Sequence, residues 1–248
     1  MHVPEWATVR AWISALAGLA AAAATAYLVW AQLYPEETER FWEITSIAVV
    51  AVVAIGSSFA RPLRIYTLDR LERERHKVSI VLRGLPWTVH ELTNGKVPVQ
   101  PLGASAWVVT PWWPFQRLHR IAHERVNEMP GPSGISWTKG KGVIGHCWHQ
   151  GREQIVDSGT FDKGHEDWTK DRWDRLDVKT RRGLSYKDYK KIRGKYGTVI
   201  AIPMFDRRER VRGVVVLDAP PGYHPLLKSP VVIEAVCAAS GVVSKLLY

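Results

Sequence analysis

The chain has 248 residues, of which 46% are hydrophobic, so it is long enough for one or two domains with a core. Its formal net charge of +10 favours partners with negative charge, either anionic lipid or nucleic acid. No helix-turn-helix or zinc-finger pattern accompanies the charge, so a specific nucleic-acid partner is not predicted and the lipid bilayer is favoured. With only two cysteines, Cys147 and Cys237, a reducing compartment without a disulfide is the default expectation.

Two charge-free runs lie near the start of the chain. Ala11 to Pro35 contains no charged side chain, and a helix needs ~20 apolar residues, rising ~1.5 Å each, to cross a bilayer. This run predicts a transmembrane helix over about residues 11–33, and a second run, Ile44 to Ala60, predicts another over about residues 42–60. A cleaved signal peptide and a buried core hairpin are the alternatives, but the first run is too long for the apolar core of a signal peptide.

The charges around these runs predict an orientation in the membrane. The connecting loop carries four glutamates and one arginine, whereas six bases follow the second run. The bases are Arg61, Arg64, Arg70, Arg73, Arg75 and Lys77. Because the side of a membrane protein rich in Lys and Arg stays in the cytoplasm, both termini are expected there. We therefore expect a multi-pass protein of the inner, cytoplasmic membrane.

Small side chains recur every four residues in both predicted spans, as in Gly18 and Ala22 of the first and Val52 and Gly56 of the second. Such stripes let helix backbones approach closely, either within the hairpin or between chains, so a homo-oligomer is expected. Residues 61–82 are interpreted as a charged helical linker. Residues 83–102, rich in Pro and Gly, are interpreted as the poorly patterned start of a cytoplasmic domain over residues 83–248.

The domain shows a recognisable order of elements. Residues 105–110 predict a buried strand, and residues 115–126 predict a strand paired with it. Residues 160–195 are polar and predict a helical or irregular insertion. Residues 197–205 and 211–219 predict the clearest hairpin in the chain, and residues 230–247 predict an amphipathic helix that opens at Pro230.

Two sequence stretches carry a family resemblance. The first contains Gly140, Gly142, Gly145, Trp148, Gly151 and Asp157, and the second contains Ala201, Pro203, Gly213, Val214, Val215 and Asp218. In this spacing and order the chain resembles a GAF domain over roughly residues 80–248, apart from residues 160–195. The resemblance implies an α+β fold, with a central antiparallel sheet, helices packed on one face and a ligand pocket on the other.

Three glycines of the first stretch can also be interpreted from backbone geometry alone. Gly140, Gly142 and Gly145 would permit a tight turn at positive φ and close backbone packing. The same spacing can signal dinucleotide binding, but no convincing strand precedes it and no strand ending in an acid follows it. A phosphate-binding P-loop is excluded because no Gly-Lys-Ser or Gly-Lys-Thr occurs.

The resemblance also implies where a ligand would bind. Trp107, Trp168 and Trp173 occupy positions where this family lines its pocket, and aromatic walls near Arg or Lys suit a flat, anionic or aromatic ligand. Packing of these rings in the core is the alternative. The cofactor is unknown, and a cyclic nucleotide is not favoured because the signature of the family's cyclic-nucleotide binders cannot be placed. The cluster His146, Cys147 and His149 is not predicted to hold a metal.

Neither bilin attachment nor sulfoxide reduction, both known in this family, is predicted from two separated thiols, and the chain is expected not to be an enzyme. Three functions remain. The first is a membrane-anchored sensory domain that binds a small, nucleotide-like ligand and signals to a partner. The second is a transmembrane effector of the anti-phage type, gated by a second messenger, whose helices perturb the membrane. The third is an interaction scaffold that binds no ligand, and the fold alone cannot choose among them.

Overall fold

The computed structural model describes residues 73–110, 116–127, 130–131, 133–163 and 168–248, with a few residues between 24 and 48. The chain divides into two compact units, Met1–Asp69 and Arg70–Tyr248. The predicted spans 11–33 and 42–60 lie almost wholly outside the described residues, and those described there, 24–25, 27–29, 31–32 and 46–48, are helical. The fold below is that of the Arg70–Tyr248 unit.

One helix in the described part of the chain, Pro230–Leu247, is long and apolar enough to cross a membrane by length and composition. Its buried face, which includes Val232, Val236 and Val243, packs on the sheet as part of the core. The structure describes too few residues of the two predicted N-terminal spans to support the expected transmembrane hairpin or a multi-pass location.

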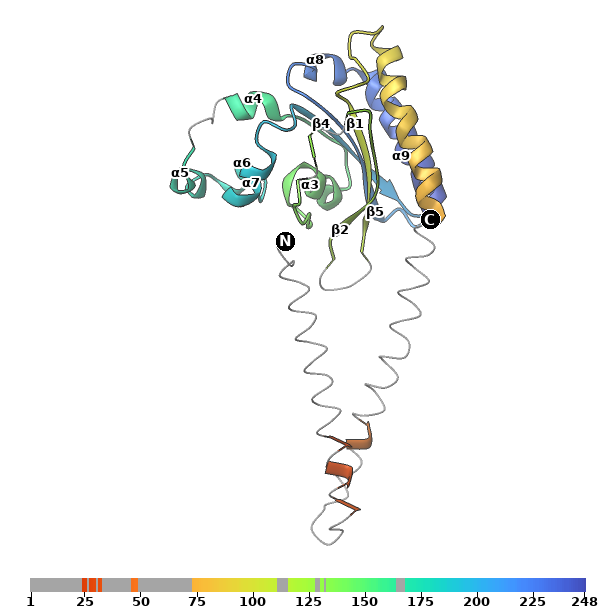
Figure 1. Cartoon of the computed structure of the whole chain (residues 1–248), viewed down its shortest axis with the longest axis vertical. Coiled ribbons are helices and arrows are strands. Elements are labelled where there is room, and N and C mark those ends of the chain that lie inside the picture. Colours follow the sequence, from red (N-terminus) through yellow and green to blue (C-terminus); the bar gives the residue numbers. More distant parts are fainter. Residues whose placement is uncertain are drawn as a thin grey trace. The chain divides into compact units, whose positions relative to one another are not determined.

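The centre of the unit is a five-stranded sheet in the order β2-β1-β5-β4-β3 (Figure 1). Its strands are β1 (Gly103–Val109), β2 (Leu118–Arg125), β3 (Gln154–Asp157), β4 (Thr198–Phe205) and β5 (Val211–Ala219). Every neighbouring pair is antiparallel. The predicted α+β class and the predicted hairpin of residues 197–219 are confirmed, since β4 and β5 are adjacent strands joined by a short turn.

The helix of residues 73–92 runs through the predicted boundary between linker and domain at residues 82 and 83. It also passes Gly84 and Pro86, which disfavour a helix interior and led us to expect irregular chain. Val78, Leu82 and Val89, spaced four and seven residues apart, are fully buried. Burial of this stripe outweighs the local propensities, so the helix is part of the domain.

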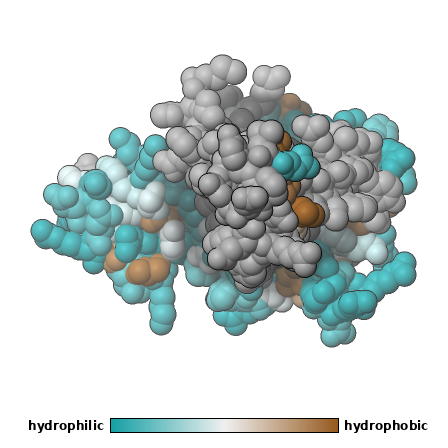
Figure 2. Space-filling model, turned by 90° about the horizontal axis from the view of Figure 1, so that it is seen from below, coloured by the Kyte–Doolittle hydropathy of each residue, from teal (hydrophilic) through white to brown (hydrophobic). Residues whose placement is uncertain are grey.

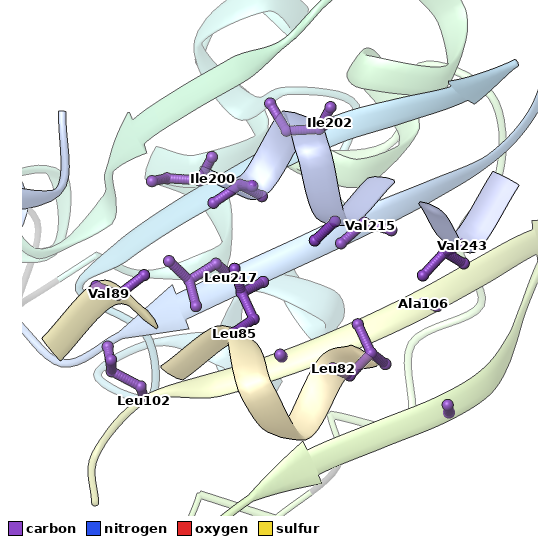
Figure 3. Close-up of a cluster of buried hydrophobic side chains, with 14 of the residues drawn as sticks. Leu82, Leu85, Val89, Leu102, Ala106, Ile200, Ile202, Val215, Leu217 and Val243 are labelled. Carbon is purple, nitrogen blue, oxygen red and sulfur yellow. The ribbon is translucent and has the colours of Figure 1, made fainter. Parts of the chain in front are cut away.

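This helix and α9 (Pro230–Leu247) cover one face of the sheet (Figure 1). Figure 3 shows Leu82, Leu85 and Val243 of the two helices against Val215 and Leu217 of β5. Two hydroxyls fix α9 to β4, because Ser240 Oγ donates to Pro203 O at 3.0 Å and Ser244 Oγ donates to Phe205 O. We name this layer the helix face.

Short helices lie over the opposite face, which we name the cavity face (Figure 1). They are α3 (Gly142–Gln150), α4 (Ser158–Lys163), α5 (Lys170–Asp174), α6 (Val178–Arg181) and α7 (Tyr186–Ile192), while α8 (His224–Leu227) precedes α9. The side chains of Thr169, Asp177 and Ser185 cap α5, α6 and α7 by accepting backbone N–H bonds. The predicted helical insertion at residues 160–195 is thus a chain of short capped helices.

Candidate functional site

The glycine loop before α3 has the predicted backbone geometry. Gly140 and Gly142 have φ of 78° and 61°, in the left-handed region that favours glycine. A Cβ at Gly145 would overlap the Thr138 carbonyl oxygen, and one at Gly142 would overlap the Trp137 ring. The Gly142 N–H donates to the Arg182 carbonyl at 2.7 Å, so the loop also holds the turn after α6.

A cavity of about 840 Å³ lies between the sheet and the short helices of the cavity face. Side chains from β1, β2, β5, α3, α4, α5 and α7 line it, so segments far apart in the sequence share one space. Its volume is within the ~300–1,000 Å³ of ordinary small-molecule sites. The pocket that the family resemblance implies, on the face opposite the two long helices, is present.

One wall of the cavity is built from two tryptophans and an arginine. Trp107 of β1 and Trp137, which precedes the glycine loop, meet edge to face with ring centroids 6.5 Å apart. The Trp107 Nε1–H donates to Ser105 Oγ at 2.9 Å. The Arg120 guanidinium lies 5.6 Å from the centroid of the Trp107 ring, so a cation and an aromatic face border the same space.

The other aromatic wall comes from the insertion. Trp173 of α5 stacks on Tyr189 of α7, with ring centroids 4.2 Å apart, and Phe161 of α4 meets both edge to face. Trp173 Nε1–H donates to Leu184 O at 3.2 Å, which fixes the ring. The stacked pair therefore joins α5 to α7 and gives the cavity a rigid aromatic side.

The structure brings two of the three predicted tryptophans to the cavity. Trp107 of β1 and Trp173 of α5 both line it. Trp168 is not among the lining residues and packs on Phe161 and Trp173, with centroids 6.4 Å and 5.9 Å away. A ligand-binding role for these three residues stays a prediction, and Trp168 would act only by supporting the wall.

The Trp137 Nε1–H, on a residue only 6% exposed in the cavity wall, has no hydrogen-bond partner among the described residues. The Tyr189 hydroxyl, on a residue 3% exposed, lies beside the Asp162 carboxylate, which acts on it through its charge and a hydrogen bond. Burial raises the pKa of Tyr189 to about 12, and the charge of Asp162 acts in the same direction, so the hydroxyl keeps its proton. A buried donor without a partner costs free energy that a ligand acceptor can recover.

The charged groups of the cavity are unevenly paired. Asp162 accepts the Gly194 N–H at 2.8 Å, and Asp218 pairs with Arg125 in the sheet. In contrast, no acidic side chain of the described residues pairs with Arg120 or Arg182. Burial lowers the pKa of Arg182, which marks a guanidinium partly removed from water. Positive charge is therefore available at Arg120 and Arg182, while Asp157 and Asp162 bring negative charge to the same cavity.

Two further groups at the wall titrate away from their usual range. Burial lowers the pKa of His123, and the positive charges of Arg120 and Arg125 act in the same direction. Burial raises the pKa of Asp218 to about 6, against the opposing effect of Arg125 beside it. The imidazole of His123 is therefore neutral at pH 7 and becomes charged only in acid.

The thiols lie apart from this space, since neither Cys147 nor Cys237 lines the cavity. Burial raises the pKa of Cys147 to about 12, with Glu153 acting in the same direction, and its thiol donates to Ala201 O. No group of three or more His, Cys, Asp or Glu side chains placed to hold a metal occurs among the described residues. The cavity is lined instead by aromatic rings, guanidinium groups, carboxylates and imidazoles.

Sequence reasoning missed four residues of the wall: Trp137, Tyr189, Arg120 and Arg182. Trp137 begins the stretch that contains the glycine loop, and Tyr189 is one of the aromatic residues of the polar insertion. The sequence therefore offered a reason to consider both as wall residues. It offered none for Arg120 and Arg182, because each is one of many arginines in a basic chain.

No protein-family model and no curated protein sequence matches this chain. Solved structures do match. The GAF domain of an Acinetobacter phosphoenolpyruvate-protein phosphotransferase is 14% identical, with a TM-score of 0.42, over 75% of this chain and 92% of that one. A type II free methionine-R-sulfoxide reductase from Thermoplasma acidophilum is 9% identical, with a TM-score of 0.43, over 70% and 94%. The Staphylococcus aureus enzyme in complex with its substrate is 14% identical, with a TM-score of 0.40, over 69% and 95%.

These comparisons correct one prediction. The chain was expected not to be an enzyme, but several structures similar to it are free methionine-R-sulfoxide reductases. Such a fold therefore carries catalytic activity in some proteins, and the expectation was wrong to exclude it. At this low identity the likeness concerns the fold alone. The five-stranded antiparallel sheet with flanking helices in the Arg70–Tyr248 unit fits a GAF-like α+β fold.

Proposed function

We propose that the Arg70–Tyr248 unit is a sensory domain that binds a small, planar, anionic molecule in the cavity of its cavity face. The observation that carries the proposal is the buried, unpartnered Trp137 Nε1–H in the wall of a cavity that Arg120 and Arg182 also line. GAF domains are commonly sensory domains that bind small molecules. The cavity's volume of about 840 Å³ suits such a ligand.

The charge and shape of the wall support the ligand class. Arg120 and Arg182 offer donors and positive charge, and the Trp137 Nε1–H can donate a hydrogen bond to a ligand acceptor. Trp107 and the stacked pair of Trp173 and Tyr189 offer aromatic surfaces for a planar ring. A nucleotide or an aromatic carboxylate has both a ring and an anionic group.

The proposal includes a membrane anchor formed by residues 11–33 and 42–60, with both termini in the cytoplasm. Its support is the sequence: two charge-free runs, an acidic connecting loop and a basic stretch after the second run. The bound domain would then signal to a partner protein. The effector function requires that the helices perturb the membrane, and the scaffold function requires that the cavity binds no ligand. Experiments can therefore separate both from the sensory function.

The ligand proposal is tested by thermal unfolding of the full chain in lipid nanodiscs with a panel of nucleotides and aromatic carboxylates. A compound at 100 times its dissociation constant should stabilise the fold by about 2.7 kcal/mol. Trp137→Phe, which keeps an aromatic ring but removes the N–H, should weaken that shift. Trp87→Phe is the matched control, because Trp87 is 57% exposed on the helix of residues 73–92.

The outcomes distinguish the candidate functions. A folded chain that responds to no compound would favour the scaffold. Compound-dependent dye release from liposomes carrying the chain would favour the effector. Each stabilising compound should also be checked for chemical change after incubation, because turnover would add a catalytic activity to binding.

The predicted topology has its own test, a single reactive cysteine at Thr38→Cys or Ser185→Cys after removal of Cys147 and Cys237. An impermeant reagent should label intact cells only at position 38, which lies in the acidic loop. Labelling at position 185 without permeabilisation would contradict the cytoplasmic placement of the domain.

A further inference from the structure

The turn between β4 and β5 lies at one end of the unit, together with the end of α9. Tyr248 OH donates to Arg212 O at 2.9 Å, and Ser244 Oγ donates to Phe205 O. The chain between α3 and β3 is at the same end, since Arg152, Phe205 and Lys245 border one groove. Sequence segments more than fifty residues apart thus meet here.

The chain also enters the unit at this end. The helix of residues 73–92 and α9 pack on the same core, in which Val78, Val243 and Leu247 are all buried. In Figure 1 the first turns of the gold helix lie near the C-terminus of α9, so the two helices run in opposite directions. Residue 73 is therefore at the same end as the β4–β5 turn.

This end is strongly basic, and we name it the basic end. Nine Lys or Arg and four Asp or Glu gather there from four segments. The bases are Arg73, Arg75, Lys77, Arg152, Arg207, Arg208, Arg210, Arg212 and Lys245, and the acids are Glu74, Glu153, Asp206 and Glu209. Figure 2, the view from below, shows hydrophilic side chains along the outer parts of the described surface.

Asp206 holds the β4–β5 turn together through hydrogen bonds and two ion pairs, and two other arginines of the turn form no ion pair with a described residue. Its carboxylate accepts the N–H groups of Arg208 and Arg210 at 2.8 and 3.1 Å. It also accepts the side chains of Arg210 and Arg212 at 2.8 and 2.9 Å. The exposed guanidinium groups of Arg207 and Arg208 form no ion pair with a described residue. Phe205, 42% exposed, lies directly before the turn.

We propose that the basic end docks on the anionic phospholipid headgroups of the membrane, with Arg207 and Arg208 as a contact distant in sequence from the anchor. Free guanidinium groups beside an exposed aromatic ring match a headgroup layer. The chain that leads into residue 73 adds Arg61, Arg64 and Arg70, so the charge is continuous with the predicted membrane side. The inference rests on the proposed anchor. It adds a fixed orientation of the domain, in which the β4–β5 hairpin touches the bilayer. The same hairpin contributes Val199 and Val216 to the cavity wall.

Hydrogen exchange measured by mass spectrometry on the full chain tests this, in nanodiscs of phosphatidylcholine alone or with about a third phosphatidylserine. Amides of residues 206–212 should exchange at least several-fold more slowly in the anionic discs. High salt should remove the difference, because screening shortens the reach of exposed charges to a few ångströms. Peptides around Lys96, at the other end of the helix of residues 73–92, should exchange equally in both discs.

Two double variants make the test specific. Arg207→Gln with Arg208→Gln should abolish the lipid-dependent protection. Lys170→Gln with Arg172→Gln, which removes the same charge from α5 on the cavity face, should leave it intact. Equal exchange of residues 206–212 in both discs, with the chain inserted, would overturn the docking surface while the anchor stands.

A chain that fails to enter nanodiscs would overturn the anchor instead. Cosedimentation with phosphatidylserine vesicles then decides the docking surface alone. Binding that is lost in the Arg207 and Arg208 double variant would support it, and no binding would overturn both proposals.

Discussion

The strands β4 and β5 contribute buried side chains to both the helix face and the cavity face. On β5, Val215 and Leu217 belong to the aliphatic cluster under the helices, whereas Val214 and Val216 belong to the aromatic cluster of the cavity side. Adjacent residues of a strand point to opposite faces, so one Val-rich run serves both. Long helices with branched aliphatic side chains fill their face, while short helices carrying large flat rings leave about 840 Å³ open on the other.

The comparison shows how stability and binding are separated within one sheet. The core of the helix face consists of buried aliphatic side chains from the two long helices and the sheet. The cavity face contains the buried Trp137 Nε1–H without a partner among the described residues, and it is held open by capped turns and a glycine loop. We therefore expect changes on the helix face to alter folding without altering the site, and changes on the cavity face to alter both or the site alone.

The largest effect is expected on the helix face. Leu82→Ala removes a fully buried side chain and should lower the free energy of unfolding by about 2–5 kcal/mol. Ligand affinity below the unfolding transition should stay unchanged, because Leu82 does not line the cavity. Denaturant unfolding and ligand titration of the same sample measure both. A marked loss of affinity in the folded variant would show that the two faces are not separable.

The glycine loop should show the next largest effect. Gly142→Val places a β-branched side chain at a φ of 61° and against the Trp137 ring, so it should destabilise by about 1–3 kcal/mol and weaken ligand binding. Gly84→Ala is the matched control, because no atom lies within 4 Å of its added Cβ and a helix favours Ala by about 0.5–1 kcal/mol. Equal behaviour of the two variants would contradict the role of the loop.

A pair of tyrosines compares a hydroxyl bonded outside the cavity with one in the cavity wall. Tyr186 OH donates to Trp168 O at 2.9 Å, so Tyr186→Phe should cost about 1 kcal/mol of stability and leave affinity unchanged. Tyr189→Phe removes a hydroxyl that lies beside Asp162 at the cavity wall, so it should weaken ligand binding as well. If Tyr189→Phe left ligand affinity unchanged, as Tyr186→Phe should, the hydroxyl would have no role in binding.

The smallest effect concerns pH. Because the pKa of His123 is lower in the folded chain than the ~6.5 of an unfolded one, its neutral form contributes stability fully above pH 6.5. That contribution is lost as the pH falls through the folded pKa. An anion in the cavity favours the charged imidazole, so ligand binding should raise the pKa of His123 and tighten in acid. Titration by NMR with and without ligand measures this, and a His123 pKa that the ligand leaves unmoved would place the anion elsewhere.

Much of the helix face could be predicted from the sequence. The hairpin of β4 and β5 and the helix α9 were predicted almost to the residue, because long apolar patterns dominate their local preferences. The continuation of the first helix through Gly84 and Pro86 could not be predicted, since its stability comes from side chains buried against the distant β5. The low helix propensities of Gly84 and Pro86 predicted irregular chain at these positions.

The cavity face was predicted only where a local backbone signal existed. The spacing of Gly140, Gly142 and Gly145 predicted positive φ and close packing, and the structure has both. The meeting of Trp137, Arg120 and Tyr189 could not be predicted, because it depends on where the insertion folds back. Trp168 and Trp173 were equal candidates by sequence, and only the packing of α5 placed Trp173 at the wall.

The most direct test of the central claim is equilibrium dialysis of the full chain against a total metabolite extract, followed by mass spectrometry of what the protein retains. We predict that one or a few anionic, ring-containing compounds are enriched by the wild type. Arg175→Gln, an exposed change directly after α5 and outside the cavity, should enrich them equally. Arg120→Gln with Arg182→Gln should lose most of that enrichment. Retention of nothing by the folded wild type, or equal retention by the double variant, would contradict the assignment of the cavity as an anion-binding site.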